Sequence, residues 1–297
     1  ISQFKVAIPG TDHHIIPDIV LFLNGLPIVV VEAKSPKVSE PLPEAIDQLM
    51  RYSEQRGDTG EGNPALFQYN QFLIVTCRNE AKAGTITTHR EKYFYRWTDP
   101  YPMTLNDLTH GQSAPNDQQR LVAGMLSLQN LLDIIRIFTI FSINDKGKKI
   151  KIVCRYQQFR AVKKMVKRLQ EGKTKEDRGG ILWHTQGSGK SLTMMFLVRQ
   201  MQLITALQSW KVVFVTDRTQ LEEQLGETGG GVGFNLKKAE FINPRADKPM
   251  CSLKELLSTN TSDLVMAMIH KFQESGELDD IQIFPVLNES PKVLILT

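Results

Sequence analysis

The stretch that most constrains the fold is residues 180–191, GILWHTQGSGKS, where a Gly-rich loop follows a short apolar run. The run at residues 181–183 predicts a short buried strand, and the Leu- and Met-rich residues 192–207 predict a long helix. A loop coiled between a strand and a helix points successive backbone N–H groups inward, and the helix N-terminus adds positive potential. We therefore expect a phosphate-binding loop within an α/β domain.

The side chains of this loop suit a nucleoside triphosphate. Lys190 would neutralise the β- and γ-phosphates, and the Ser191 hydroxyl would bind Mg²⁺. His184 stands where the strict pattern has Gly, and an ordinary Gly-rich turn is the simpler alternative. The strand and helix expected on either side favour the phosphate loop. The expected ATP-binding residues of the loop are Thr185, Gln186, Gly187, Ser188, Gly189, Lys190 and Ser191.

A helix expected over residues 154–170 precedes this loop. Its first turn contains Gln157 and Gln158, and a Gln amide can hydrogen-bond both the amino group and N7 of adenine. In superfamily 2 helicase-like motors a Gln well before the loop has this role, and Gln158 is similar in placement. Gln157 is the alternative, and Arg155 could stack on the base.

Further strands are expected after the loop. Residues 211–224 predict a strand that leads into a helix, and residues 263–272 and 291–297 predict two more strands. Strands and helices that alternate in this way favour an open parallel sheet whose site lies at the carboxyl ends of its strands. Four residues near such ends are Thr216, Arg218, His270 and Lys271. A local helix-capping pair of Asp217 and Arg218 is a nearly equal alternative, and spacing alone predicts for His270 only a strand-end residue with no special task.

A second group of functional candidates lies near the N-terminus. Two β-rich runs flank Asn24-Gly25, which predicts a hairpin. Asp18 precedes the first run, while Glu32 and Lys34 are two residues apart in the second and so share one face of the strand. Two carboxylates, with the Ala33 carbonyl, can hold a divalent ion such as Mg²⁺, and a lysine can stabilise or deprotonate an attacking water.

The metal site requires Asp18 and Glu32 to face each other across the hairpin. A two-residue turn at Asn24-Gly25 would instead pair Asp18 with Val31 and place the carboxylates on opposite faces. We therefore expect a hairpin loop of three or five residues.

A helix expected over residues 39–56 follows the hairpin and carries Gln48 and Tyr52 on one face. Each of these features is weak alone, because Glu-Ala-Lys is a common tripeptide and a Gln/Tyr pair is more often plain surface. Their ordered combination is much less common. Further strands are expected at residues 71–76 and 93–97, and bridging helices at residues 121–141.

Together, Pro17-Asp18, Glu32-Ala33-Lys34 and the Gln48 to Tyr52 segment resemble the PD-(D/E)xK nuclease core with its Q-x-x-x-Y motif. With the motor-like motifs, the chain resembles the R (restriction, translocating) subunit of type I restriction-modification enzymes. The resemblance implies that Asp18 and Glu32 bind the metal, Lys34 is catalytic, and Gln48 and Tyr52 support the site. It also implies that the four strand-end residues contact DNA: Thr216, Arg218, His270 and Lys271.

The resemblance implies an α/β fold in three parts. A PD-(D/E)xK domain with a mixed sheet would span residues 1–97, and a linker with bridging helices would span residues 98–145. A RecA-like first motor lobe would span residues 146–297. The chain starts with Ile1 and stops in an apolar run at Thr297. We therefore expect a piece of a longer protein, without the Walker B acids and second lobe, and with negligible ATPase activity.

The function implied is that of an ATP-dependent type I site-specific deoxyribonuclease, which cleaves and translocates double-stranded DNA. Its cofactors would be Mg²⁺ and ATP, and its partners the specificity (S) and modification (M) subunits in a bacterial or archaeal cytoplasm. Two alternatives are a repair-type helicase-nuclease and a P-loop nucleotide-binding protein with a non-catalytic N-terminal interaction domain. The second alternative leaves the ordered set from Asp18 to Tyr52 as coincidence.

Composition is consistent with this expectation. The chain has 297 residues, 41% of them hydrophobic and 23% charged, which favours two globular domains. Its net charge of +4 is compatible with a nucleic-acid partner without requiring one. The three cysteines are far apart and indicate neither a disulfide framework nor a zinc site. The longest apolar stretch, residues 19–31, is interrupted and too short to span a membrane.

Overall fold

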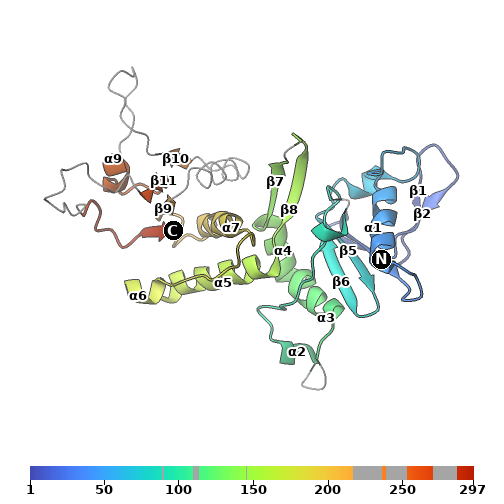
Figure 1. Cartoon of the computed structure of the whole chain (residues 1–297), viewed down its shortest axis with the longest axis horizontal. Helices are drawn as coiled ribbons and strands as arrows, with labels where there is room; N and C mark the ends of the chain where they lie inside the picture. The colour runs from blue at the N-terminus through green and yellow to red at the C-terminus, as the bar shows by residue number, and fades with distance from the viewer. Residues whose placement is uncertain (89, 110–113, 145, 217–235, 239–252, 270–285) are drawn as a thin grey trace, which may run out of the picture. The chain divides into compact units, whose positions relative to one another are not determined.

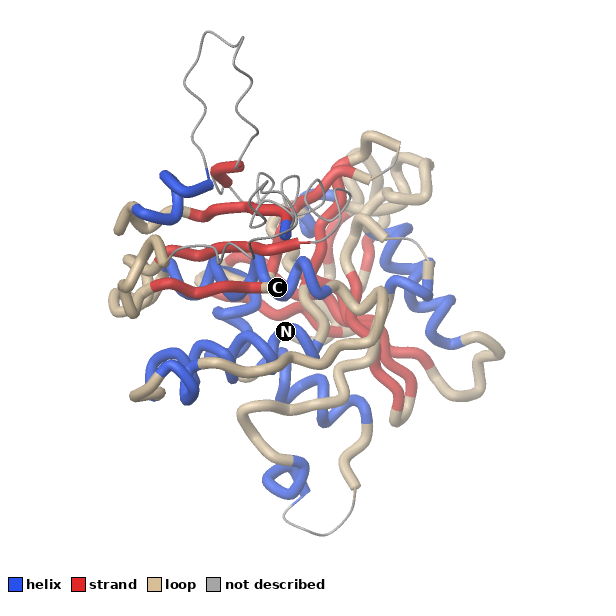
Figure 2. Tube along the Cα trace, turned by 60° about the vertical axis from the view of Figure 1, so that its left-hand side comes forward, coloured by secondary structure: helices blue, strands red, loops and turns tan. Residues whose placement is uncertain are grey.

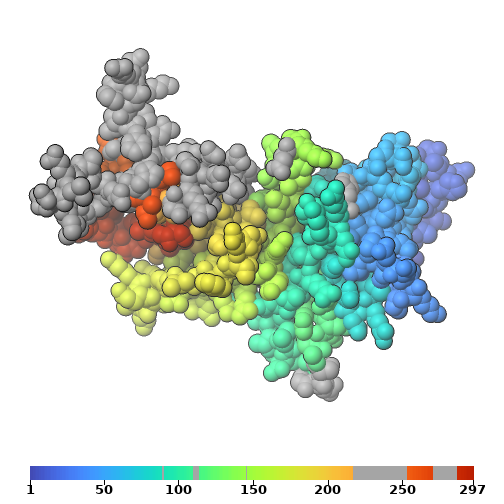
Figure 3. Space-filling view, in the orientation of Figure 1, coloured from blue at the N-terminus to red at the C-terminus, as the bar shows by residue number. Residues whose placement is uncertain are grey.

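A computed structural model describes residues 1–297 except 89, 110–113, 145, 217–235, 239–252 and 270–285, which are grey in Figure 1 and Figure 3. The chain divides into two compact units, Ile1–Arg160 and Ala161–Thr297. The boundary falls inside helix α5 (Tyr156–Glu171), whose extent agrees with the helix expected over residues 154–170. The three-part division expected from the sequence stays a prediction. Within the described ranges, no helix is both long enough and apolar enough to cross a membrane.

The first unit contains a four-stranded mixed sheet in the order β3-β4-β5-β6. Strand β4 pairs antiparallel with β3 and parallel with β5, and β6 returns antiparallel to β5. The expected strand at residues 71–76 is confirmed as β5. The bounds are β3 Ile19–Leu23, β4 Leu26–Lys34, β5 Phe72–Cys77 and β6 Glu80–Gly84.

The predicted hairpin is present, but its predicted loop length is wrong. The turn contains two residues, Asn24 and Gly25, with φ angles of 49° and 81° that suit a tight turn. Leu23 pairs with Leu26, yet Leu21 pairs with Val29, so the register shifts within the ladder. This shift leaves Ile28 as an extra residue on β4, which is a β-bulge. Beyond it Ile19 pairs with Val31, the register that brings Asp18 and Glu32 to facing positions.

Helix α1 (Pro41–Tyr52) packs on one face of this sheet. It is shorter at both ends than the helix expected over residues 39–56. Pro41 and Pro43 suit the first turn, where backbone N–H groups have no intrahelical partner, and Glu54 ends the segment with φ +55°. The buried face of α1 packs on side chains of β3, β4 and β5 that include Val20, Val30, Leu73 and Val75.

The rest of the first unit differs in part from expectation. Residues 93–97 form no strand, because only Tyr95 makes an isolated bridge, to Ala83. The apolar segment at residues 121–141 ends in a strand rather than a helix, since β-branched residues there join a hairpin. The remaining elements are β1 Val6–Ala7, β2 His14–Ile15, η1 Pro64–Phe67, η2 Glu91–Tyr93, α2 Leu105–Thr109, α3 Asp117–Leu121, η3 Val122–Leu126, α4 Leu128–Arg136, β7 Thr139–Ile143 and β8 Lys149–Val153.

The second unit is built on a parallel sheet. Its described strands have the order β10-β11-β9-β12 and run side by side at the left of Figure 2. The strands expected at the start of 211–224, in 263–272 and in 291–297 are therefore confirmed. The elements are α6 Lys175–Arg178, α7 Lys190–Gln202, β9 Lys211–Thr216, β10 Leu236–Lys238, α9 Leu253–Ser258, β11 Leu264–Met268 and β12 Val293–Leu296.

The short buried strand predicted before the Gly-rich loop is wrong. Residues 181–183 have no strand assignment, and Ile181 and Trp183 are 97% and 86% exposed. Three apolar residues carry no usable periodicity, so they do not distinguish a buried strand from an exposed extended segment. The helix expected after the loop is confirmed as α7, although it ends at Gln202 rather than near residue 207.

Candidate functional site

Asp18 and Glu32 lie on the same face of the mixed sheet. Asp18 is two residues from Val20, and Glu32 is two residues from Val30, and both valines pack in the core beneath α1. The Asp18 carboxylate is fixed by two hydrogen bonds, because the Ala33 N–H donates to Oδ2 and Gln3 Nε2 donates to Oδ1, each at 2.8 Å. The bulge therefore achieves what a longer loop was expected to provide.

Glu32 is the buried carboxylate of this cluster. It is only 2% exposed, and its Oε2 atom has no hydrogen-bond partner. Burial, with a further contribution from the nearby Asp18 carboxylate, raises the pKa of Glu32 to about 7, although Lys34 opposes this shift. A buried carboxylate oxygen without a partner is costly unless a cation or proton occupies it.

Lys34 joins the sheet to α1. Its Nζ lies 3.5 Å from Glu32 Oε1 and donates a hydrogen bond to Gln48 Oε1. Gln48 Nε2 donates to the Tyr52 hydroxyl at 2.5 Å, and that hydroxyl donates to the Ile16 carbonyl at 3.5 Å. Burial, and next the charge of Glu32, raise the pKa of Tyr52. The structure thus brings Lys34, Gln48 and Tyr52 into one hydrogen-bonded network with Glu32.

The residues present fit a divalent cation. The Glu32 oxygen without a partner and the Asp18 carboxylate lie on one face, and oxygen ligands suit Mg²⁺ or Mn²⁺. Within the described ranges, no group of three or more His, Cys, Asp or Glu side chains is placed to hold a metal. A metal held by the Asp18 and Glu32 carboxylates would have other positions for water or substrate oxygen, as Mg²⁺ commonly does.

One acidic neighbour was not singled out from the sequence. Glu44, in the first turn of α1, has its Oε1 3.5 Å from Lys34 Nζ. The available signal was its spacing, since Glu44, Gln48 and Tyr52 are each four residues apart and so lie along one side of a helix.

The Gly-rich loop forms a compact turn at the start of α7. Gly187 and Gly189 have φ angles of 74° and 82°, which residues with a Cβ atom rarely adopt, and Gly189 is the N-cap of the helix. The Ser188 hydroxyl donates to the Thr185 carbonyl at 2.7 Å, and Lys190 Nζ donates to the His184 carbonyl at 3.3 Å. The exposed Lys190 and half-buried Ser191 open the first turn of α7, where backbone N–H groups favour anions.

His184 and Gln186 occupy the remaining positions of this loop. Burial, followed by the charge of Lys190, lowers the pKa of His184, whose Nδ1 is buried without a hydrogen-bond partner. A neutral imidazole here avoids a second positive charge beside Lys190. Gln186 is exposed.

The residues expected to bind adenine lie at the start of α5, and the structure shows their local contacts. Gln158 is 3% exposed, and its Oε1 accepts a hydrogen bond of 2.8 Å from the Arg155 N–H at the start of α5. Gln157 Oε1 is buried without a hydrogen-bond partner. The adenine-binding role of Gln158, with Arg155 stacking on the base, therefore stays a prediction.

Of the expected DNA-contact residues, only Thr216 is described. It ends β9 and is 4% exposed. Arg218, His270 and Lys271 lie outside the described residues.

Comparisons with known proteins match both units. Residues 1–92 match the family model described as "Type I restriction enzyme R protein N terminus", and residues 157–297 match the SWI2/SNF2 ATPase model. The first match contains the carboxylate cluster, and the second contains the Gly-rich loop. The chain thus combines an R-protein N-terminal region with an ATPase-type region.

Individual relatives agree with these two matches. The chain is 32% identical over 286 residues to the type I restriction enzyme HindI endonuclease subunit of Haemophilus influenzae, covering 95% of this chain and 25% of the relative. It is 30% identical over 298 residues to the putative type I restriction enzyme MjaIXP endonuclease subunit of Methanocaldococcus jannaschii, covering 94% of this chain and 26% of the relative. The chain belongs to the family of type I restriction enzyme endonuclease subunits and spans about a quarter of the length of these curated relatives.

Proposed function

We propose that this chain supplies the DNA-cleaving site and the first part of the ATP-driven motor of a type I restriction enzyme. The proposed nuclease has a PD-(D/E)xK fold, and the second unit is a RecA-like lobe. The observation that carries the nuclease proposal is the network from Glu32 through Lys34 and Gln48 to Tyr52, with the free Glu32 oxygen facing the same side as Asp18.

In this proposal Asp18 and Glu32 hold Mg²⁺, which when bound supplies Lewis-acid activation of the scissile phosphate. Hydrogen bonds from Ala33 and Gln3 keep the Asp18 carboxylate oriented. Lys34 orients the attacking water and offsets negative charge that develops on the phosphate. The hydrogen bond from Lys34 Nζ to Gln48 holds the ammonium in place for this role. Tyr52 holds the Gln48 amide in place and so acts through it.

The proposed motor site uses the backbone N–H groups of the Gly-rich loop, with Lys190 and Ser191, to bind Mg²⁺ and ATP. Gln158 and Arg155 would recognise the adenine. Thr216, Arg218, His270 and Lys271 would contact the backbone of double-stranded DNA during translocation. The partners are the specificity and modification subunits of the restriction complex.

A pair of lysine variants in the full-length assembled enzyme tests this proposal. Lys34→Ala should lower DNA cleavage by about a hundredfold or more while ATP hydrolysis is preserved. The matched control is Lys92→Ala, which removes an exposed lysine whose ammonium lies over Tyr93, outside the network. Unchanged cleavage by Lys34→Ala would instead favour an N-terminal interaction domain. Cleavage that needs no specificity or modification subunit would favour a repair-type helicase-nuclease.

A further inference from the structure

Helix α1 presents three polar side chains along one side. Glu44, Gln48 and Tyr52 are spaced four residues apart, and Gln48 and Tyr52 are joined by a hydrogen bond. Glu44 lies in the first turn of α1, where the positive end of the helix favours a carboxylate. Glu44 therefore continues the row of Gln48 and Tyr52 by one turn, toward the start of α1.

Lys34 contacts both this row of side chains on α1 and Glu32 on the sheet. Its side chain is 14% exposed, and its Nζ lies 3.5 Å from Glu32 Oε1 and 3.5 Å from Glu44 Oε1. Gln48 Oε1 accepts its hydrogen bond. Lys34 thus has one hydrogen-bond acceptor, Gln48, and two carboxylates at ion-pair distance.

The two carboxylates that share Lys34 differ in exposure. The Glu32 side chain is 3% exposed, while the Glu44 side chain is 54% exposed. Without the charge of Glu44, the ammonium would have one carboxylate partner, in the less hydrated setting where a charge pair is stronger. Lys34 would then pair more tightly with Glu32 and compete with any cation for that carboxylate.

We infer that Glu44 is a positioning residue that draws the Lys34 ammonium partly away from Glu32 and thereby keeps Glu32 available to a divalent cation. The inference rests on the proposed metal role of Asp18 and Glu32. Glu44 itself touches neither the metal nor the DNA in this account, since it acts through Lys34. Its negative charge adds to the same effect, because it lowers the cost of placing a cation nearby.

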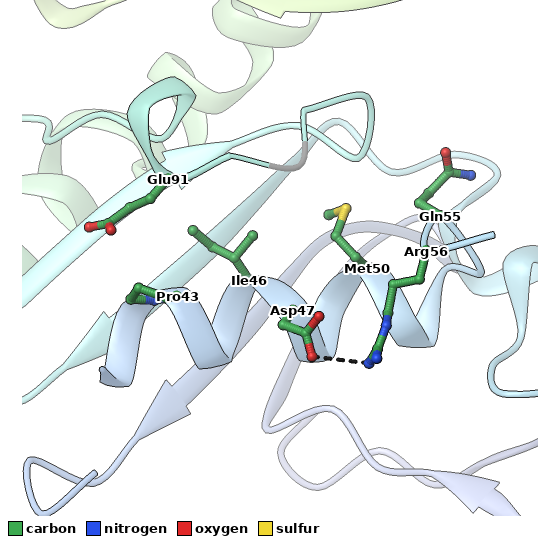
Figure 4. Close-up of a pocket in the computed structure, with 7 residues that line it drawn as sticks. All are labelled: Pro43, Ile46, Asp47, Met50, Gln55, Arg56 and Glu91. Atoms are coloured by element: carbon green, nitrogen blue, oxygen red, sulfur yellow. Dashed lines mark hydrogen bonds and ion pairs between the residues drawn. The ribbon is translucent and has the colours of Figure 1, made fainter. Parts of the chain in front are cut away.

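Asp47 provides a matched control on the same helix. Its carboxylate is exposed and pairs with Arg56 at 3.0 Å, and Figure 4 shows this pair among the residues that line a pocket. The substitutions Glu44→Gln and Asp47→Asn remove one negative charge each, within one turn of the other, and only the first removes a partner of Lys34.

Calorimetry with Mn²⁺ on the whole metal-free chain tests the inference. We expect Glu44→Gln to weaken Mn²⁺ binding about fivefold and Asp47→Asn to change it less than about twofold. Glu44→Asp, which keeps the charge on a shorter side chain, should recover part of the affinity. In a Lys34→Gln background the effect of Glu44→Gln should fall below about twofold, because the ammonium that it positions is gone.

The outcomes separate this inference from the proposed function. Equal Mn²⁺ affinities for Glu44→Gln and Asp47→Asn would overturn the role of Glu44 and leave the metal site standing. The same would follow if Glu44→Gln weakened binding equally with and without Lys34, since Glu44 would then act by charge alone. A wild-type chain that binds no Mn²⁺ would overturn the proposed metal site and this inference with it.

Discussion

The carboxylate cluster and the Gly-rich loop are built in different ways. The cluster joins residues from a hairpin and a helix, and a bulge in the ladder sets which of them face each other. The loop is contiguous, and its geometry comes from glycines and from the start of one helix. A contiguous motif depends little on its surroundings, whereas a dispersed site depends on strand register and on packing.

The two sites also differ in electrostatic cost. Glu32 is buried and one of its oxygens has no partner, while Lys190 is exposed at a helix N-terminus. Functional sites commonly contain groups that are unfavourable for folding until a ligand binds. The cluster is therefore expected to cost stability in the free chain, and the loop is not.

The largest expected effect is on stability at the cluster. Because the pKa of Glu32 is raised to about 7, the folded chain binds a proton that the unfolded chain releases between about pH 4.5 and pH 7. The free energy of unfolding therefore falls as pH rises through this window. Glu32→Gln should raise it by roughly 3 kcal/mol at pH 8 and leave it nearly unchanged at pH 4.

Chemical unfolding of the metal-free chain at both pH values measures this difference. Asp47→Asn, at an exposed position on α1, is the control and should show little change at either pH. A Glu32→Gln chain that is less stable than wild type at pH 8 would mean that the carboxylate is not strained in the folded chain.

A smaller effect is expected for nucleotide binding at the loop. Lys190→Ala should weaken binding of Mg²⁺-ATP about tenfold, because a charge-assisted contact to phosphate is lost. Its unfolding free energy should stay close to that of wild type, since the side chain is exposed. Titration with a fluorescent ATP analogue measures the affinity, with Lys173→Ala, another exposed lysine, as the control. Equal binding by both variants would remove Lys190 from the nucleotide site.

The smallest effect concerns the turn of the hairpin. Gly25→Ala should lower the unfolding free energy by about 1 kcal/mol, because Gly25 has φ +81°. It should leave Mn²⁺ affinity unchanged, since the bulge rather than the turn sets the register at Asp18. Gly147→Ala, at φ +73° in the turn between β7 and β8, is the matched control. A Gly25→Ala chain with much weaker Mn²⁺ binding would show that the turn itself positions the carboxylates.

The sequence predicts the hairpin but not the β-bulge that sets its register. Asn24-Gly25 correctly predicts a turn between two strands, because the positive φ angles of a tight turn favour these residues. The bulge at Ile28 was not predictable, since an extra Ile in an apolar run looks like any other buried strand residue. Without a bulge, only a longer loop would have paired Asp18 with Glu32.

The other differences have the same physical origin. Whether residues 181–183 are buried depends on pairing with a strand that is distant in the sequence. Three apolar residues do not specify that pairing. Spacing alone places Gln48 and Tyr52 on one face and extends that face to Glu44, but it does not show that Glu44 lies beside Lys34. Local periodicity predicts which residues share a face, and tertiary packing decides which of them touch.

The most direct test of the central claim is calorimetric titration of Mn²⁺ into the metal-free chain, comparing wild type with Asp18→Asn. Asp18→Asn keeps the size of the side chain and removes the charge that faces Glu32. We predict one Mn²⁺ site in wild type and an affinity at least about tenfold lower in the variant. Equal affinities in the two chains would contradict a metal site formed by Asp18 and Glu32.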